Sequence, residues 1–296
     1  MILREIELND FDRIFPVAPV VYASGRFNAL NATKADRVVA LAAFDGERPV
    51  AGQIFGLRDG IWRAPFSAPF SCITSCTSEV CDRFYALAAE HLDAPLRLVW
   101  PSATYPVDAP PAAATRLFDD ANFHYPMHRF DDFESHLSRS GRYSHHRSQK
   151  HPFQFAKTDD AARAYRIIDE NRRAMGYPLA MSLAQVVDTV GIVPADFFVM
   201  SLDGVDIAAA MLFRVTARIM QLIYWGDIPA ARHTRPMNRL AWEIFRWYAI
   251  NRPEIETIDI GPASSDGIIN RGLADFKLSI GCVQTSRPTL QLKTEN

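Results

Sequence analysis

The same pattern occurs twice in the chain, in FFVMSLDGVDIAAAMLFRVTARIMQLIYW (Phe197–Trp225) and in VVALAAFDGERPVAGQIFGLRDGIWRAPF (Val38–Phe66). Each stretch has an apolar run, an Asp-Gly pair, a second run rich in small apolar residues, a polar turn and a third run. Asp-Gly between apolar runs favours a tight hairpin, because glycine accepts the positive φ that such a turn requires. The pairs Asp45-Gly46 and Asp203-Gly204 therefore predict two antiparallel hairpins, each extended by a third strand.

The elements that follow the two hairpins also come in the same order. A helix follows each hairpin, and after it come a short strand that ends in proline, a second helical segment and a final strand. Because the whole order repeats at a nearly constant offset, we predict two copies of one α/β unit with mixed sheets, fused in tandem. The paired segments are the helices Ser78–His91 and Pro236–Ile250 and the strands Leu96–Pro101 and Glu256–Pro262.

The second copy has well-marked helix boundaries. Residues 160–175 have helical spacing and precede a glycine and a proline, which predicts a helix that ends there. Ser182 and Gln185 form a capping box that opens a short helix ending near Gly191. Pro236 suits the first turn of the next helix, whose apolar residues recur at helical spacing and predict one buried stripe.

The segment Ser138–Lys157 lies between the copies and is basic and poor in large apolar residues. We predict an N-terminal unit over 1–137, a basic linker over 138–157 and a C-terminal unit over 158–296. The linker is interpreted as a solvated helix or loop, as a patch facing the phosphates of a cofactor or of an RNA end, or as a metal site, although its histidines lack a carboxylate or cysteine at ligand spacing. Its basic residues are Arg139, Arg142, His145, His146, Arg147, Lys150 and His151.

The composition indicates a folded protein with a full core, since 48% of its 296 residues are hydrophobic and 22% are charged. The net charge of −2 excludes a protein that binds polyanions through its overall charge. No apolar run has the length of a membrane span and no signal-peptide pattern opens the chain, so we expect a cytoplasmic protein without stable membrane insertion. Because no Cys-x-x-Cys pair occurs, we expect free thiols and no metal site at Cys72, Cys76, Cys81 and Cys282.

Three stretches carry a family resemblance: Tyr143–Phe155 with its basic residues, Asn171–Ser182 (NRRAMGYPLAMS) and Gly272–Gly281 (GLADFKLSIG). With the order of elements, they resemble the GNAT acyltransferase superfamily, and the duplicated form resembles its FemAB-like branch, in which a basic segment joins two GNAT units. The resemblance covers nearly the whole chain in layout. The turn Gly226–Arg235 departs from the glycine-rich turn of members that bind acetyl-CoA, because it has one glycine, and the paired-helix arm of some cell-wall aminoacyl transferases has no counterpart.

The resemblance implies an N-acyltransferase. Its donor would be an acyl-CoA, with acetyl-CoA first, or an aminoacyl-tRNA, and its acceptor an amine of a small molecule or of a cell-envelope precursor. In GNAT-like units the fourth and fifth strands separate, and the donor phosphates lie at the N-terminus of the central helix, where amide N–H groups and the helix dipole favour an anion. The residues assigned to the donor on this basis are Arg232, His233, Thr234, Arg235, Asn238 and Lys277.

Alternatives stay open for these donor residues. Three basic side chains within one turn of the helix start oppose the helix dipole, and a bound anion would remove that conflict. Otherwise the turn is a solvated surface turn. Lys277 is alternatively a solvated surface lysine, and it does not share a helix face with Asp275, which is two residues away.

Two residues of the second copy are candidates for the chemistry. Asp259, inside an apolar strand, is either the general base or a structural carboxylate that accepts N–H groups from the loop Ala263–Gly267. Tyr224, late in the fourth strand, either binds substrate and protonates the leaving group or is a core aromatic residue whose hydroxyl reaches the surface. The residues predicted to bind the acceptor are Asn171, Arg173, Tyr177 and Trp225.

The first copy is predicted to be non-catalytic, because the position that matches Asp259 is the apolar Val99 or Trp100. The prolines of Trp62–Phe70 predict that this stretch leaves the sheet, and its aromatic residues either form a wall of a substrate pocket or pack on the first copy's own core. Two other functions stay open: a non-catalytic ligand-binding protein with the duplicated fold, and a nucleic-acid binder that uses Ser138–Lys157. The acceptor and the oligomeric state also stay open.

Overall fold

The structure of the protein, a computed structural model, describes residues 1–75, 77–107 and 109–292, so Cys76, one of the predicted thiols, lies outside the described residues. The chain divides into two compact units. The first unit consists of Met1–Ala121, Ser264–Ile268 and the residues from Ser286 onward. The second unit consists of Asn122–Ala263 and Ile269–Thr285.

The first unit is built on a mixed sheet with the strand order β1-β2-β3-β4-β6-β15. Its first three neighbouring pairs are antiparallel, β4 and β6 are parallel, and β6 and β15 are antiparallel. The strands are β1 (Ile2–Ile6), β2 (Arg37–Asp45), β3 (Arg48–Arg58), β4 (Ile61–Ala64), β6 (Leu96–Val99) and β15 (Val283–Leu292), and the short β5 (Thr74–Ser75) pairs with β3.

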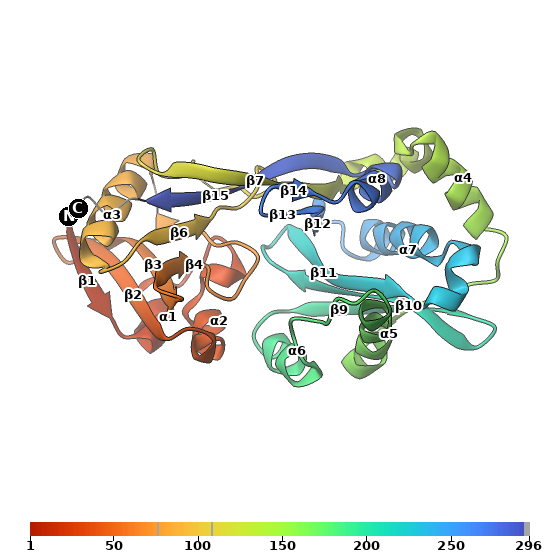
Figure 1. The fold of residues 1–296 in the computed structure, drawn as a ribbon, viewed down its shortest axis with the longest axis horizontal. Coiled ribbons are helices and arrows are strands. Elements are labelled where there is room, and N and C mark those ends of the chain that lie inside the picture. Colours follow the sequence, from red (N-terminus) through yellow and green to blue (C-terminus); the bar gives the residue numbers. More distant parts are fainter. Residues whose placement is uncertain (76, 108, 293–296) are drawn as a thin grey trace. The chain divides into compact units, whose positions relative to one another are not determined.

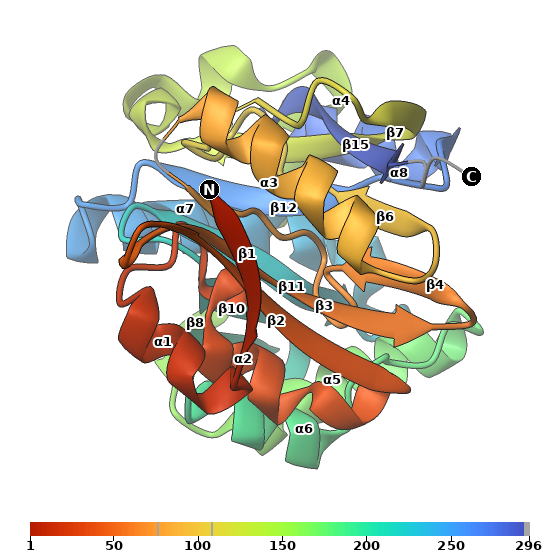
Figure 2. The same ribbon diagram turned by 90° about the vertical axis from the view of Figure 1, so that its left-hand side faces the viewer.

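Helices cover both faces of this sheet, as Figure 2 shows. Side chains alternate along β2, so Val39 and Leu41 pack in the core cluster of α3, whereas Ala40 packs with Phe11 of α1. These two apolar clusters hold the sheet between the helices. The helices are α1 (Phe11–Ile14), α2 (Gly25–Leu30) and α3 (Ser78–His91), with the 3-10 helices η1 (Leu8–Asp10), η2 (Val21–Ala23) and η3 (Ala32–Lys34).

The second unit repeats this arrangement with the strand order β8-β9-β10-β11-β12-β7 (Figure 1). Again the fourth and fifth strands, β11 and β12, are parallel, and the other neighbouring pairs are antiparallel. The strands are β7 (Thr115–Pro126), β8 (Gln154–Thr158), β9 (Ala195–Leu202), β10 (Val205–Arg214), β11 (Ile219–Asp227) and β12 (Thr257–Pro262).

Helices α5 and α7 pack across β9, β10 and β11, one on each face of the sheet (Figure 1). Helix α5 therefore covers one face of the strand whose end forms the candidate site, and α7 covers the other. The helices of the second unit are η4 (Met127–His136), α4 (Arg139–Ser148), α5 (Ala161–Ala174), α6 (Leu183–Val190), η5 (Pro229–Thr234), α7 (Pro236–Asn251) and α8 (Arg271–Ser279).

The last strand of each half of the chain completes the sheet of the other unit. Residues 122–126 of β7 pair with β12, where Tyr125 is opposite Ile258. Residues 289–292 of β15 pair with β6, where Leu290 is opposite Leu98. The two units therefore differ from the predicted divisions 1–137, 138–157 and 158–296, because both strands have partners that are distant in sequence.

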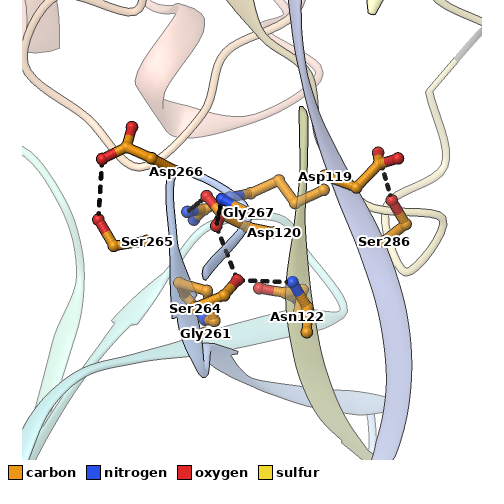
Figure 3. Close-up of polar contacts among 12 residues, drawn as sticks. Asp119, Asp120, Asn122, Gly261, Ser264, Ser265, Asp266, Gly267 and Ser286 are labelled. Carbon is orange, nitrogen blue, oxygen red and sulfur yellow. Dashed lines mark hydrogen bonds and ion pairs between the residues drawn. The ribbon is translucent and has the colours of Figure 1, made fainter. Parts of the chain in front are cut away.

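Two carboxylates tie distant segments of the chain into the first unit (Figure 3). Asp120 Oδ1 accepts a hydrogen bond of 2.7 Å from Ser264 Oγ and one of 3.2 Å from the Gly267 N–H. Asp119 Oδ1 accepts a hydrogen bond of 2.7 Å from Ser286 Oγ. These bonds fix the hairpin of β13 (Ser264–Ser265) and β14 (Ile268–Ile269), together with Ser286 of β15, to the middle of β7.

The duplicated α/β unit and most of the predicted helices are confirmed. Helix α3 spans the predicted Ser78–His91, and α7 begins at Pro236 as expected. The capping box is present, because Ser182 Oγ accepts from the Gln185 N–H and Gln185 Oε1 accepts from the Ser182 N–H. The second helical segment predicted for the first copy is wrong: residues 101–107 and 109–114 contain no helix. Prolines in this stretch lack the N–H group that a helix interior needs.

The stretch Trp62–Phe70 and the predicted linker can also be compared with their predictions. The chain leaves the sheet after Ala64, as predicted, and Phe66 and Phe70 then pack inside the first unit, against Phe11 and Tyr105 respectively. This supports the interpretation of the stretch as loop packing. The segment predicted as a linker forms α4 and most of β8, and both belong to the second unit.

Candidate active site

The parallel strands β11 and β12 separate after a short paired stretch. Their registered pairs end at Gln221 and Asp259. Beyond this point β11 stays paired with β10 as far as Asp227, and β12 stays paired with β7 as far as Pro262. Each strand therefore keeps its outer neighbour while the two inner edges part, which is the arrangement that the family resemblance implies.

A β-bulge in β11 decides which side chains share a face at this point. Tyr224 is opposite Met211 on β10, whereas Gln221 is opposite Phe213, so Ile223 is the extra residue of the bulge. Met211 and Phe213 lie on one face because they are two residues apart, and their partners Tyr224 and Gln221 lie on that same face. In-register pairing extends this face to Asp259 on β12 and, from there, to β7.

The carboxylate of Asp259 is completely buried at the point of strand separation. Its Oδ1 accepts hydrogen bonds of 2.9 Å from Asn122 Nδ2 and from the Gly261 N–H, and its Oδ2 accepts one of 3.1 Å from Gln221 Nε2. These donors stabilise a buried anion, which is costly without them. The backbone donor is Gly261 rather than the predicted loop Ala263–Gly267, and a role of Asp259 as general base stays a prediction.

Lys277, predicted to bind a donor phosphate, is instead buried at the end of β12. Only 2% of the residue is exposed, and its Nζ donates to the carbonyl oxygens of Ile260 at 2.9 Å, Gly261 at 2.8 Å and Pro262 at 2.9 Å. An ammonium has three hydrogens, and this geometry directs them to three backbone acceptors. The surface alternative is therefore wrong, because α8 presents this residue to β12, and the phosphate assignment stays a prediction.

His124 on β7 belongs to the same face, and the sequence-based reasoning missed it. It is opposite Asp259 in the antiparallel register, so the two side chains lie on one side of the sheet. Burial lowers the pKa of the half-buried imidazole, the charge of Asp259 raises it, and that of Arg129 lowers it. Its partnership with β12 is invisible in the sequence, because β7 stands far from β12 along the chain.

Tyr224 is half-buried on the unpaired part of β11. Burial raises the pKa of its hydroxyl, while the charge of Arg172 and backbone hydrogen bonds from Ala180 and Met181 lower it. The Arg172 guanidinium carbon lies 5.9 Å from the centre of the tyrosine ring. Because the net shift is upward, the hydroxyl keeps its proton at neutral pH, and its contacts hold the loop after α5 against β11. Proton donation by Tyr224 stays a prediction.

The four residues predicted to bind the acceptor make different contacts. Asn171 is buried, and its Nδ2 donates to Asp227 O at 2.7 Å and to Asp227 Oδ1 at 3.1 Å, so it fastens α5 to the end of β11. Arg173 forms an exposed ion pair with Asp169, and the ring of Trp225 packs on that of Phe276. Tyr177 is 65% exposed. The acceptor assignments of Asn171, Arg173, Tyr177 and Trp225 all stay predictions.

The residues predicted to bind the donor phosphates surround the start of α7. Arg235 is exposed and adopts φ +61° immediately before the helix, whose first turn has no side-chain cap. Arg232 Nε pairs with Asp227 Oδ1 at 3.1 Å, and the buried Thr234 hydroxyl donates to Ala231 O. His233 is exposed, with Nδ1 3.0 Å from Ala230 O, and Asn238 is half-buried. Arg235 therefore meets solvent beside the uncapped turn, whereas Thr234 is engaged within η5.

Cations of α4 lie close to the start of α7. The hydrogen bond and charge of Arg147 lower the pKa of the exposed Tyr143 hydroxyl, and the charges of Arg235 and Lys150 lower it further. The charges of Arg147 on α4, of Lys150 just after α4 and of Arg235 before α7 therefore all act on this one hydroxyl. The linker interpretations as a solvated helix and as a phosphate-facing patch both stay open, since the basic residues are largely exposed.

The buried His145 of α4 makes the stability of the second unit depend on pH. Burial lowers its pKa, Glu134 raises it, and His146 and Arg239 lower it. The unfolded chain binds this proton near pH 6.5 and the folded chain only at lower pH, so the free energy of unfolding decreases as the pH falls below 6.5. In urea unfolding at pH 7.5 and 5.5, His145→Gln should lose less stability than the wild type. The exposed control His128→Gln should follow the wild type, and an unchanged decrease in His145→Gln would contradict this account.

The described residues contain neither a metal-binding cluster nor a helix that could span a membrane. Within residues 1–75, 77–107 and 109–292, no three His, Cys, Asp or Glu side chains gather as a metal site would require. The cysteines in these ranges, Cys72, Cys81 and Cys282, are buried and not joined in disulfide bonds. No helix in the described part of the chain is long and apolar enough to cross a membrane.

Comparison with known proteins shows which solved structures share this fold. No protein-family model and no curated protein matches the chain. Among solved structures it is similar to FemX, with a TM-score of 0.68 and 9% identity over 99% of this chain and 98% of that chain. It is also similar to the C-terminal domain (DUF2156) of a putative lysylphosphatidylglycerol synthetase from Agrobacterium fabrum, with a TM-score of 0.62 and 15% identity over 96% and 92% of the chains.

A third similar structure is a tandem GNAT protein from the clavulanic acid biosynthesis pathway, with a TM-score of 0.55 and 11% identity over 100% of this chain and 99% of that chain. At such identities the likeness concerns the fold. The fold is that of two GNAT units in tandem. Its form is FemAB-like, so the resemblance drawn from Tyr143–Phe155, Asn171–Ser182 and Gly272–Gly281 is confirmed at the level of architecture.

Proposed function

We propose that the protein is an acyltransferase that transfers an acyl or aminoacyl group from a phosphate-bearing donor to an amine. The separation of β11 and β12 beside the start of α7 is the observation that carries the proposal. Residues 222–227 of β11 have an inner edge that β12 does not use, and N–H groups on this edge can receive the donor carbonyl. Such donors stabilise the oxygen as it becomes negative during amine attack.

The donor phosphates would bind at the first turn of α7. Pro236 has no N–H group, so the N–H groups of Met237 and Asn238 are the first donors of this turn, and the N-cap residue Arg235 supplies no side-chain cap for them. Arg235 is exposed beside them, and the charges of Arg147 and Lys150 act on the same region. An anion there satisfies the helix end and relieves the repulsion among these cations.

Both donor classes fit this arrangement, and the exposed cations of α4 support the larger one. Arg139, Arg142 and Arg147 extend the positive surface along a helix of ten residues, which is more than one pyrophosphate requires. The similar structures carry names that fit either donor, since one is a tandem GNAT protein described without AcCoA and another a putative lysylphosphatidylglycerol synthetase. Aminoacyl-tRNA is therefore the first donor to test, and acetyl-CoA the second.

Calorimetric titration of the full chain with charged tRNA and, separately, with acetyl-CoA tests the proposal. We expect one donor to bind, and Arg235→Ala to weaken that binding about tenfold, because a hydrogen bond to a charged group contributes roughly 1.5–3 kcal/mol. Arg13→Ala removes another exposed arginine and should bind like the wild type. Release of uncharged tRNA or of free CoA in the presence of an amine measures transfer. Binding of neither donor refutes the proposal, and binding without transfer favours a non-catalytic ligand-binding protein.

A further inference from the structure

The polar face of the second sheet contains a group suited to proton transfer. We propose that His124 accepts the proton of the attacking amine and that Asp259 positions its imidazole ring. This inference rests on the proposed acyl transfer and names a residue for one step of it. The juxtaposition that supports it is the in-register pair His124 and Asp259 at the end of the paired stretch of β11 and β12.

The register places His124 within reach of the separated strands. Asp259 is the last β12 residue paired with β11, and His124 is its direct neighbour on β7. Direct cross-strand neighbours have Cβ atoms about 5 Å apart on one face of the sheet. Tyr224 lies on this face too, on the unpaired part of β11. A group bound along the inner edge of β11 on this face is therefore at least two strand spacings, roughly 10 Å, from the β7 backbone, and the side chain of His124 stands on the same face of the sheet.

Asp259 itself is a poorer proton acceptor than its neighbour. Its carboxylate is completely buried, and its two oxygens already accept hydrogen bonds from Asn122, Gly261 and Gln221. A carboxylate held by these three donors is a fixed negative charge, and it orients the imidazole ring of His124 on the neighbouring strand. His124 is half-buried, so part of the residue meets solvent, where an amine can approach. The division of roles is therefore a positioning carboxylate and an accessible base.

The charges around His124 suit a base that works near neutral pH. Burial lowers the pKa of the imidazole, Asp259 of β12 raises it and Arg129 of η4 lowers it. The downward result keeps the ring neutral above about pH 6.5, which is the form that accepts a proton. Asp259 favours the imidazolium once it forms, because an opposite charge nearby stabilises it.

The step balances without any further reactant. A neutral amine forms a bond from its nitrogen to the carbonyl carbon of the donor, and one N–H proton passes to the imidazole of His124. The ester C–O bond of an aminoacyl-tRNA, or the thioester C–S bond of an acyl-CoA, then breaks. The imidazolium returns the proton to the leaving oxygen or sulfur, so the amide is formed and His124 is neutral again.

The test compares His124→Gln with the wild type in the full chain, using charged tRNA or acetyl-CoA with a primary amine. We expect kcat to fall roughly 100-fold or more, because general-base catalysis contributes about that factor. The donor Kd should change less than twofold, and the decline of kcat below pH 6.5 should disappear. Asp259→Asn should move the midpoint of that decline to lower pH, because it removes the charge that raises the pKa of His124. His128→Gln, an exposed histidine of η4, is the matched control and should leave kcat unchanged.

The outcomes separate the two proposals. A wild type that binds neither donor overturns the proposed function and this inference with it. A wild type that transfers, together with a His124→Gln variant that keeps kcat within threefold and the same decline at low pH, overturns the role of His124 alone. Should His124→Gln not fold, the wild type decides: kcat at saturating substrates must decline with a midpoint below pH 6.5, and a rate independent of pH between 5 and 7 overturns the inference.

Discussion

Replacing Lys277 with methionine is expected to lower the free energy of unfolding by about 3–5 kcal/mol. The ammonium holds the carbonyl oxygens of Ile260, Gly261 and Pro262, and all three lose their donor when an apolar chain of similar length takes its place. A buried acceptor without a partner costs roughly 1–3 kcal/mol. Urea unfolding followed by circular dichroism measures the effect. Lys150→Met, at an exposed position just after α4, is the control and should lie within about 0.5 kcal/mol of the wild type.

The same substitution should also remove donor binding. Lys277 satisfies the carbonyl groups of residues 260–262, and Asp259 satisfies the Gly261 N–H, so this end of β12 needs no partner on β11. Without the lysine, these carbonyl groups must find other donors, and the nearest supply is the inner edge of β11. Lys277→Arg keeps a cation and should recover part of the stability. A Lys277→Met variant within 1 kcal/mol of the wild type, with full donor affinity, would falsify this account of the strand separation.

Local signals made the helices of both units predictable. The capping box of Ser182 and Gln185 and the proline that opens α7 are each complete within four residues, so their physics is contained in the sequence. The Asp-Gly turns likewise require only local backbone freedom, since Gly46 and Gly204 adopt positive φ. From such signals the repeat, and with it the tandem architecture, could be derived.

The features that could not be predicted depend on contacts between segments that are distant in sequence. The pairing of β7 with β12 depends on which strand fills the free edge of each sheet, and no local pattern encodes that choice. His124 was missed for this reason. Helical spacing correctly separates Asp275, which is exposed, from Lys277, which is buried. It does not state which face meets β12, so the contacts of the lysine with the backbone of β12 were not predicted.

Substituting Gly141 by alanine is expected to destabilise the protein by about 3 kcal/mol, because the first turn of α4 contacts the backbone of α8 directly. A Cβ atom at Gly141 would lie 1.8 Å from the carbonyl oxygen of Ser279 and 2.7 Å from its carbonyl carbon. These are backbone atoms at the end of α8, so no side-chain rotation relieves the overlap, and α4 must shift. Urea unfolding measures the loss of stability.

The shift of α4 should weaken donor binding about tenfold as well, because the charges of Arg147 on this helix and of Lys150 just after it act on the same hydroxyl, that of Tyr143, as the charge of Arg235 before α7. Gly272→Ala is the matched control, since the nearest atom to its Cβ is 3.7 Å away and alanine favours the first turn of α8. That variant should be as stable as the wild type or slightly more stable, with unchanged donor affinity. If Gly141→Ala behaves like Gly272→Ala, the close approach of α4 to α8 does not hold the cations of α4 beside α7, and the positive surface proposed for the donor loses its structural support.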